Sequence, residues 1–242
     1  MLETRSRRRQ IRLRYAVEPY PASWLIEDDE KVPQSRPHHL GGKRLEEVLL
    51  GWKQRTGRDV QVGRELALRW DAEFPRVGVD PDVYVVEPPP PEGDEATSLR
   101  TWETGHHPPL LAIEIVSRSR PDKDYGSSPL KYAAAGAQEL WIFDPYLFGP
   151  RAQEGPFRLQ VWRREEGSFT RVYTGEGPVY SRAIEAWVLT TDEGRSLVIA
   201  DDEAGTSPWL TPEESERARA EQERARADRL AERLRQLGVD PE

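Results

Sequence analysis

Cysteine is absent from this chain, and methionine occurs only once in its 242 residues. Without cysteine the chain forms neither a disulfide bond nor a thiolate zinc site, so a reducing cytoplasm is the simplest location to predict. No apolar run approaches the roughly 20 residues that a membrane-spanning helix requires. The arginines near the N-terminus are not followed by the apolar segment of a secretory signal. These absences predict a cytoplasmic protein with no membrane partner.

The composition is polar for a globular domain, with 36% hydrophobic and 32% charged residues. The 43 acidic and 35 basic residues give a net charge of −8. This charge provides no overall attraction to nucleic acid, but it leaves room for a local basic groove. A chain of this length suits one domain of moderate size with appendages.

The N-terminal zone, residues 1–37, is polar, punctuated by proline and rich in arginine. We predict a basic, partly flexible arm. The arm is either simply solvated or in contact with phosphate groups. Its arginine cluster consists of Arg5, Arg7, Arg8, Arg9, Arg12 and Arg14.

The C-terminal zone predicts a charged helix over residues 211–238. Thr211 suits the cap position, Pro212 suits the first helical position, and Glu213 faces the positive end of the helix dipole. Arginine and glutamate interleave at spacings that favour ion pairs within the helix. A clear apolar stripe occurs only near its end, at Leu230, Leu234 and Leu237. The helix is therefore either exposed and held by its own charge pairs, or a weak coiled-coil contact with another chain.

The middle zone, residues 38–200, alternates helix and strand patterns and predicts an α/β core with a mixed β-sheet flanked by helices. The second of its two helices has Ser128 as its cap, Pro129 in its first turn and Gly136 at its end. The other predicted elements are a helix over residues 42–55, strands over 60–70, 77–86, 110–116, 139–143, 157–163 and 168–174, and loops over 88–109 and 117–127.

One carboxylate, Glu114, lies inside an apolar run that is typical of a strand buried on both faces. An unpaired buried charge is strongly destabilising, so Glu114 needs a partner, a proton or a metal ion. A second apolar run, residues 83–86, follows directly after Asp82. We predict that neighbouring strands bring the two carboxylates into one divalent-cation site, with the carbonyl of Ile115 as a third ligand. The alternative is structural: Asp82 caps a turn and Glu114 pairs with an arginine.

A cation such as Mg²⁺ at this site would lower the pKa of bound water and neutralise charge on a phosphoryl group. Hydrolysis would also require a lysine near the attacking water. The adjacent pairs His38-His39 and His106-His107 lack metal-ligand spacing, because neighbouring side chains point in different directions. We predict that they are solvated loop histidines.

The order of short motifs between residues 79 and 145 resembles that of the Uma2 family, which is restriction endonuclease-like and belongs to the PD-(D/E)XK nuclease superfamily. The resemblance covers about residues 38–190. The motifs are residues 79–86, residues 109–117, Asp124, residues 131–136 and residues 139–145. The resemblance implies a restriction-endonuclease-like fold and a metal-dependent nuclease activity.

Carried over residue by residue, the resemblance makes Asp82 and Glu114 the metal ligands. Val116 stands where many superfamily members have lysine, and Uma2 proteins place a lysine on the following helix instead. That position is Ser128 here, so the lysine that orients or activates water is Lys131 or, as the alternative, Lys123. We favour Lys131, which lies on a similar helix face one turn away.

The resemblance thus implies an endonuclease that cleaves DNA phosphodiester bonds with Mg²⁺, for which Mn²⁺ is a substitute. A homodimer would suit the cleavage of both strands. Glu46 or Glu47 would supply the additional acidic ligand of some superfamily members, or would simply face solvent. The alternative function is that of a catalytically inactive protein that uses the same fold to bind nucleic acid or to assemble.

Overall fold

The computed structural model describes residues 10–11, 20–26, 36–151 and 155–236. The chain forms two compact units, residues 1–209 and 210–242. The elements of the first unit are β1 (Gln10–Ile11), η1 (Ala22–Trp24), α1 (Arg36–Thr56), β2 (Gln61–Gly63), β3 (Ala67–Arg69), β4 (Gly78–Val79), β5 (Val83–Val86), η2 (Gly93–Glu95), β6 (Ser98–Arg100), β7 (Leu111–Ile115), α2 (Pro121–Ala135), β8 (Glu139–Phe143), β9 (Leu159–Glu165), β10 (Ser168–Gly175), β11 (Val179–Ser181), β12 (Ala186–Thr191) and β13 (Ser196–Ala200). The second unit contains α3 (Pro212–Gln236). Within these described ranges, no helix has the length and apolar character needed to cross a membrane.

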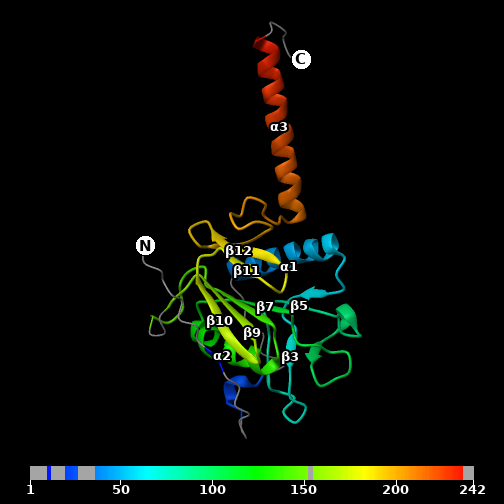
Figure 1. The fold of residues 1–242 in the computed structure, drawn as a ribbon, viewed down its shortest axis with the longest axis vertical. Helices are drawn as coiled ribbons and strands as arrows, with labels where there is room; N and C mark the ends of the chain where they lie inside the picture. Colours follow the sequence, from blue (N-terminus) through cyan, green and yellow to red (C-terminus); the bar gives the residue numbers. More distant parts are fainter. Residues whose placement is uncertain (1–9, 12–19, 27–35, 152–154, 237–242) are drawn as a thin grey trace. The chain divides into compact units, whose positions relative to one another are not determined.

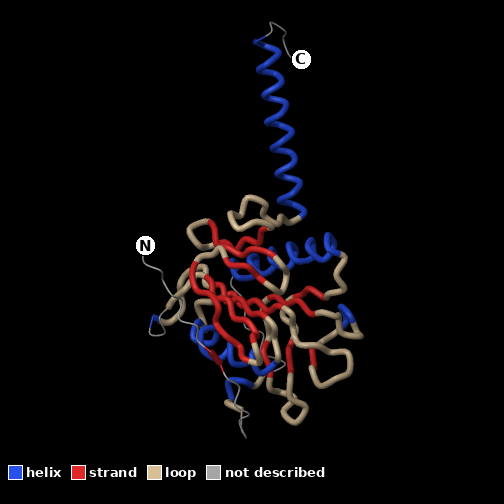
Figure 2. The backbone as a smooth tube through the Cα atoms, viewed as in Figure 1, coloured by secondary structure: helices blue, strands red, loops and turns tan. Residues whose placement is uncertain are grey.

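A seven-stranded mixed sheet lies at the centre of the first unit (Figure 1, Figure 2). Its strand order is β1-β10-β9-β8-β7-β5-β2, in which β7 and β8 run parallel and the other neighbours run antiparallel. Two three-stranded sheets, β11-β12-β13 and β4-β3-β6, accompany it. The predicted α/β class, with a mixed sheet flanked by helices, is confirmed.

The two faces of the main sheet pack against different parts of the chain. On one face, β7 contributes Leu111, Ile113 and Ile115 to a core shared with α1 and the β11-β12-β13 sheet. On the other face, Ala112 packs in a core shared with α2 and the β4-β3-β6 sheet. Because side chains alternate along a strand, Glu114 lies on the same face as Ala112, toward α2.

Two predicted strands prove to be two strands each. Residues 60–70 contain β2, which belongs to the main sheet, and β3, which belongs to the β4-β3-β6 sheet. Residues 77–86 divide in the same way into β4 and β5 around Pro81, which has no backbone N–H to give to a ladder. The predicted loop over residues 88–109 also contains β6, which pairs with β3 and buries Leu99. The pattern of polar and apolar residues indicates that a segment is extended, but it does not indicate which sheet the segment joins.

The predicted start of the second helix at Ser128 is wrong. Helix α2 begins at Pro121, inside the segment predicted as a loop, so Pro121 and not Pro129 is the proline of the first turn. Its predicted end is confirmed, since Gly136 adopts the left-handed conformation with φ of 87° and its N–H donates to backbone carbonyls of the last turn. The polar residues of the first turns led to the loop prediction. One of them, Asp124, is buried against the Lys123 ammonium, whereas Asp122 faces solvent.

Parts of the predicted N-terminal arm pack against the first unit. β1 pairs with β10, the Tyr20 hydroxyl donates to the Asp71 carboxylate at 2.8 Å, and Leu25 forms a β-bridge with Val77. The arginine cluster between residues 5 and 14 lies outside the described residues.

The second unit is built on α3, and its first turn has the predicted cap. The Thr211 N–H donates to the Glu214 carboxylate at 2.9 Å, and the Glu214 N–H donates to Thr211 Oγ1 at 3.2 Å. This reciprocal arrangement satisfies two of the N–H groups that a helix start leaves unpaired. An ion pair between Arg217 and Glu213 at 3.0 Å follows one turn on. Leu230 is exposed, whereas the Leu234 side chain and Leu237 lie outside what the structure describes.

A buried carboxylate on β8 links three parts of the first unit. Glu139 accepts hydrogen bonds from Trp141 Nε1 at 2.8 Å, Ser181 Oγ at 2.5 Å, Arg163 Nε at 3.0 Å and the Arg182 N–H at 3.1 Å. These donors come from β8, β9 and the end of β11. Glu139 thus joins the main sheet to the β11-β12-β13 sheet.

We predict that Glu139→Ala lowers the free energy of unfolding by about 3–5 kcal/mol, because it removes the counter-ion of Arg163 and leaves Arg163 Nε and the other buried donors without an acceptor. Urea denaturation followed by tryptophan fluorescence measures this loss. Glu47→Ala is the control, since it removes an exposed ion pair with Lys43 and should change the stability by less than about 1 kcal/mol. Equal losses in the two variants would contradict a structural role for the buried carboxylate.

We also predict that deleting residues 211–242 leaves the melting temperature of the first unit nearly unchanged. The capping box and ion pairs described above join residues of the second unit to each other. A single short leucine stripe does not hold a stable coiled coil, so the sedimentation coefficient should still indicate the same number of subunits. Dissociation of a dimer upon deletion would show instead that α3 is the assembly element.

Candidate metal-binding active site

The register of β5 and β7 brings the two predicted metal ligands to one place. These strands are antiparallel with Val83 opposite Ile113, so one step further along the register Asp82 lies opposite Glu114. Side chains directly opposite each other on one face have Cβ atoms roughly 5 Å apart. The Asp82 Oδ2 atom also accepts the Ile115 N–H at 2.6 Å. The Asp82 carboxylate is therefore held at the strand end that carries Glu114.

Glu114 is buried, and both of its carboxylate oxygens have partners. The Tyr132 hydroxyl donates to Oε1 at 2.8 Å, and Lys123 Nζ lies 3.4 Å from Oε2. Burial, together with the negative charges of Asp124 and Asp82, raises the pKa of Glu114 to about 8 against the opposing effect of the Lys123 ammonium. Burial also keeps the pKa of Tyr132 far above its usual value, so this hydroxyl stays a donor. The counter-ion of Glu114 is thus a lysine rather than an arginine.

A third carboxylate, Asp124, belongs to the same charged group. Lys123 Nζ lies 3.5 Å from Asp124 Oδ1, and Ser128 Oγ donates to the same oxygen at 3.4 Å. Burial and the negative charge of Asp82 raise the pKa of Asp124 to about 6, and the positive charge of Lys123 opposes this shift. Sequence reasoning used Asp124 only as a motif position. A helix extended back to Pro121 would have placed Asp124, Ser128 and Tyr132 on one face, at spacings of four residues.

The two candidate lysines of α2 differ in their surroundings. Lys123 contacts Glu114 and Asp124 directly, and the charge of Glu114 raises its pKa. Lys131 is buried, and burial together with the charge of Lys123 lowers its pKa to about 8. The charges of Glu114 and Asp80 act on Lys131 in the opposite direction. Lys123 is therefore the cation in contact with the carboxylates, whereas Lys131 lies within their electrostatic field.

His38 is also part of this site, so the prediction that it is a solvated loop residue is wrong. Helix α1 begins at Arg36, which places His38 in the first turn and buries it. His38 Nε2 lies 2.8 Å from the Ile115 carbonyl oxygen and 3.2 Å from Asp82 Oδ2. Because a carbonyl oxygen only accepts, Nε2 carries the hydrogen. Burial lowers the pKa of His38, but the Asp82 carboxylate and the Ile115 carbonyl outweigh it and the pKa is raised.

The donor set fits a hard divalent cation. Asp82, Glu114 and Asp124 supply carboxylate oxygens and Ile115 supplies a carbonyl, which are the ligand types that Mg²⁺ prefers. The repulsion among these carboxylates raises the pKa of Glu114 and of Asp124, and a bound cation would relieve it. In this structure the Lys123 ammonium lies between Glu114 and Asp124 and provides part of the same compensation.

A different group of ligand atoms lies close together in the loop before β7. Ligand atoms of Glu92, Glu103 and His106 all lie within 4.8 Å of one another. However, His106 Nδ1 accepts the Arg100 N–H at 3.1 Å, so Nε2 carries the hydrogen and donates it to Glu92, with the nearest oxygen at 3.1 Å. A nitrogen that bears a hydrogen is not a metal ligand, so His106 is a buried clamp of this loop. The prediction of a solvated histidine is wrong for His106 as well.

The other sequence candidates have separate surroundings. His107 is an exposed loop residue, as predicted, and His39 is also exposed but belongs to α1 and not to a loop. Glu47 pairs with Lys43 at 3.5 Å. Burial raises the pKa of Glu46, and the nearby guanidinium of Arg64 opposes this effect. The contacts described for Glu46 and Glu47 do not connect them to Asp82 or Glu114.

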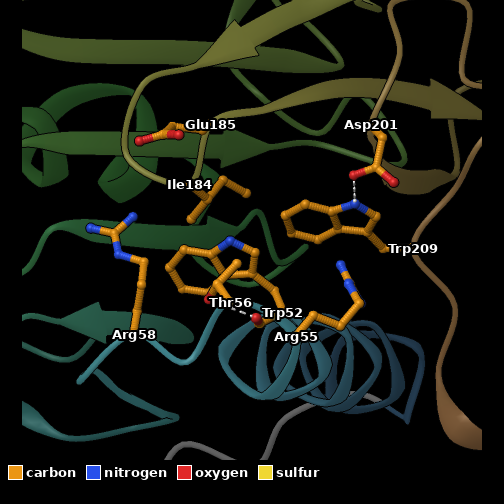
Figure 3. Close-up of a pocket in the computed structure, with 8 residues that line it drawn as sticks. All are labelled: Trp52, Arg55, Thr56, Arg58, Ile184, Glu185, Asp201 and Trp209. Carbon is orange, nitrogen blue, oxygen red and sulfur yellow. Dashed lines mark hydrogen bonds between the residues drawn. The ribbon is translucent and has the colours of Figure 1, made fainter.

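A cavity of about 320 Å³ lies at the C-terminal end of α1 (Figure 3). The indoles of Trp52 and Trp209 stack there with centroids 6.4 Å apart. The Arg55 guanidinium lies 4.8 Å from the Trp209 ring, and that of Arg58 lies 5.1 Å from the Trp52 ring. Trp209 Nε1 donates to Asp201 at 2.6 Å. The two guanidinium groups of this cavity thus make cation–π contacts with its two indole rings. None of the residues of the carboxylate site lines the cavity.

Comparisons with known proteins give the family of the chain. No curated protein matches the chain. A crystal structure from Anabaena variabilis, described as "a putative nuclease belonging to DUF820", is 17% identical with a TM-score of 0.43, and the match covers 64% of this chain and 76% of that chain. Residues 23–192 match the Uma2 family, whose description is "Putative restriction endonuclease". Since this match covers more than half of the sequence, the chain belongs to the Uma2 family of restriction endonuclease-like proteins.

Proposed function

We propose that the protein is a Mg²⁺-dependent endonuclease that hydrolyses phosphodiester bonds of DNA, with Mn²⁺ as a substitute metal. The observation that carries this proposal is the pair formed by Asp82, directly before β5, and Glu114 on β7, which the strand register sets opposite each other, with Lys123 of α2 at 3.4 Å from Glu114. A pair of carboxylates with a nearby carbonyl is a minimal ligand set for Mg²⁺. Membership of a family described as restriction endonucleases supports the reaction class.

In this proposal Asp82, Glu114 and the Ile115 carbonyl hold the metal, which supplies charge neutralisation at the phosphoryl group and acidifies bound water. The Tyr132 hydroxyl orients Glu114 through its 2.8 Å hydrogen bond. His38 orients Asp82 from α1 through its Nε2 hydrogen.

The two lysines have different roles in the proposed reaction. Lys131 takes the proton of the attacking water, because a pKa lowered to about 8 leaves an appreciable neutral fraction near neutral pH. Lys123 stays protonated beside Glu114 and Asp124, so it stabilises negative charge and does not accept a proton.

The second candidate function is that of a catalytically inactive nuclease fold that binds nucleic acid or assembles. The observation that favours it is Ser128, buried on α2 at the position where the family pattern has lysine. For either function we propose a cytoplasmic location, in line with the absence of cysteine. A homodimer whose contacts lie in the first unit is the arrangement that would cut both strands of a duplex.

We predict that Asp82→Asn and Glu114→Gln each weaken Mn²⁺ binding by more than the roughly 10–100-fold that a change beside the ligands causes. The reason is that each variant removes one charged ligand. Mn²⁺ binding measured by electron paramagnetic resonance tests this, and cleavage of supercoiled plasmid should be lost in parallel. Glu47→Gln serves as the control with unchanged binding. Wild-type affinity in Glu114→Gln would exclude the proposed metal site.

We predict that Lys131→Met lowers kcat by about 10²–10⁴, the usual contribution of a general base, while Mn²⁺ binding and folding persist. Lys123→Met should instead destabilise the metal-free protein, since it leaves Glu114 and Asp124 without their counter-ion, and Mn²⁺ should restore the stability. Plasmid cleavage and thermal melting with and without Mn²⁺ separate these effects. If Lys123→Met abolishes cleavage and Lys131→Met does not, the two roles are reversed. If the wild-type protein cuts neither duplex nor single-stranded DNA with Mg²⁺ or Mn²⁺, the inactive alternative replaces the nuclease.

A further inference from the structure

The connection from β8 to β9 exposes two large apolar side chains in adjacent positions. Tyr146 is 48% exposed and Leu147 is 39% exposed. Leu147 has a φ of 54°, in the left-handed region that leucine disfavours by roughly 1–2 kcal/mol. An exposed apolar pair on a strained backbone is unfavourable for stability alone, so its occurrence here points to contact with a partner.

This connection leaves the sheet at the edge where the candidate active site lies. β7 and β8 are parallel with Ile115 opposite Phe143, so both strands end at the same edge. Tyr146 follows Phe143 by three residues, which span at most roughly 10 Å of extended chain. The exposed pair is therefore close to the end of β7 that carries Glu114.

A buried carboxylate, Asp144, fixes the conformation of the β8–β9 connection. Asp144 accepts the Tyr125 hydroxyl at 3.0 Å, the Phe148 N–H at 2.9 Å and the Gly149 N–H at 2.8 Å. The Phe148 ring packs against the core, and its centroid lies 5.4 Å from that of Tyr146. Gly149 lies so close to Tyr125 that a Cβ atom there would come within 2.3 Å of the ring. The exposure of Tyr146 is thus a fixed feature, built on the helix that also carries Asp124.

Exposed arginines occur in both connections that leave this edge. Arg118 follows β7 in the loop that leads to α2, and Arg151 lies in the middle of the β8–β9 connection, five residues after Tyr146. The chain as a whole has a net charge of −8, so attraction for a polyanion must come from local cations such as these. An exposed aromatic ring, with exposed arginines in the two connections that leave this edge, matches a nucleic-acid strand, which offers bases for stacking and phosphates for arginine.

We propose that Tyr146, supported by Leu147, stacks on a base of the nucleic-acid strand bound at this edge, while Arg118 and Arg151 contact its phosphates. The choice of nucleic acid as partner rests on the proposed function. The surface itself is independent of the metal ligands and of both catalytic lysines.

The test is the affinity of the full-length protein for fluorescein-labelled 20-nucleotide DNA, single-stranded and duplex, measured by fluorescence anisotropy without divalent metal. Tyr146→Ala should weaken binding about tenfold, the typical effect of losing one base–aromatic stack. Tyr180→Ala is the matched control, since Tyr180 is 41% exposed but lies on β11 of a different sheet. Thermal melting should show that both variants fold as the wild type does.

A second variant keeps the proposal open to refutation if Tyr146→Ala disturbs the loop. Leu147→Asn removes the apolar side chain and suits the left-handed backbone, so it should fold at least as well and still weaken binding. Unchanged affinity in both variants overturns the proposal, as does DNA-independent self-association that Tyr146→Ala abolishes, which would identify a protein partner.

The binding experiment and the cleavage experiment can fail independently of each other. If wild-type protein cleaves nothing but Tyr146→Ala still weakens DNA binding, the nucleic-acid surface stands and the nuclease proposal fails. If the wild type cleaves DNA and Tyr146→Ala binds and cleaves DNA normally, the nuclease stands and the surface is refuted.

Discussion

The antiparallel register of β5 and β7 is the constraint on which the rest of the site depends. It places Asp82 opposite Glu114, and a shift of one residue would turn one of the two carboxylates to the opposite face of the sheet. The apolar residues on the α1 side maintain this register, because Ile113 and Val83 are fully buried there. The packing of one face thus determines the chemistry of the other. The parallel pairing of β7 with β8 then brings the β8–β9 connection to the same edge.

Buried carboxylates occur in two kinds of environment in this protein. Glu139 accepts four hydrogen bonds and Asp144 accepts three, so their charges are matched by fixed donors. Glu114 and Asp124 instead lie near each other and near Asp82, and their pKa values are raised by burial and by mutual repulsion. Carboxylates with a full set of fixed donors stabilise a fold, whereas buried carboxylates that repel one another favour a bound cation. This difference separates the structural acids from the candidate metal ligands.

Helix α2 carries several of the polar side chains that surround these carboxylates. Its first turns carry Lys123 and Asp124, and its later turns carry Lys131 and Tyr132. The same helix contacts the β8–β9 connection through Tyr125, which donates to Asp144. One helix therefore contacts both the candidate metal site and the β8–β9 connection, across the end of two parallel strands.

The sequence by itself determined the features that depend on neighbouring residues along the chain. An acid within an apolar run identified Glu114, an acid before a second run identified Asp82, and local capping signals identified Thr211 and Gly136. The order of the motifs indicated the family. The tertiary structure decided the features that depend on residues far apart in sequence. His38 is buried where it contacts the carbonyl of Ile115, 77 positions away, and Glu114 pairs with Lys123, in the first turns of a helix whose polar start was predicted as a loop. A polar residue that faces a buried charge and one that faces water have the same local signature, so only the fold distinguishes them.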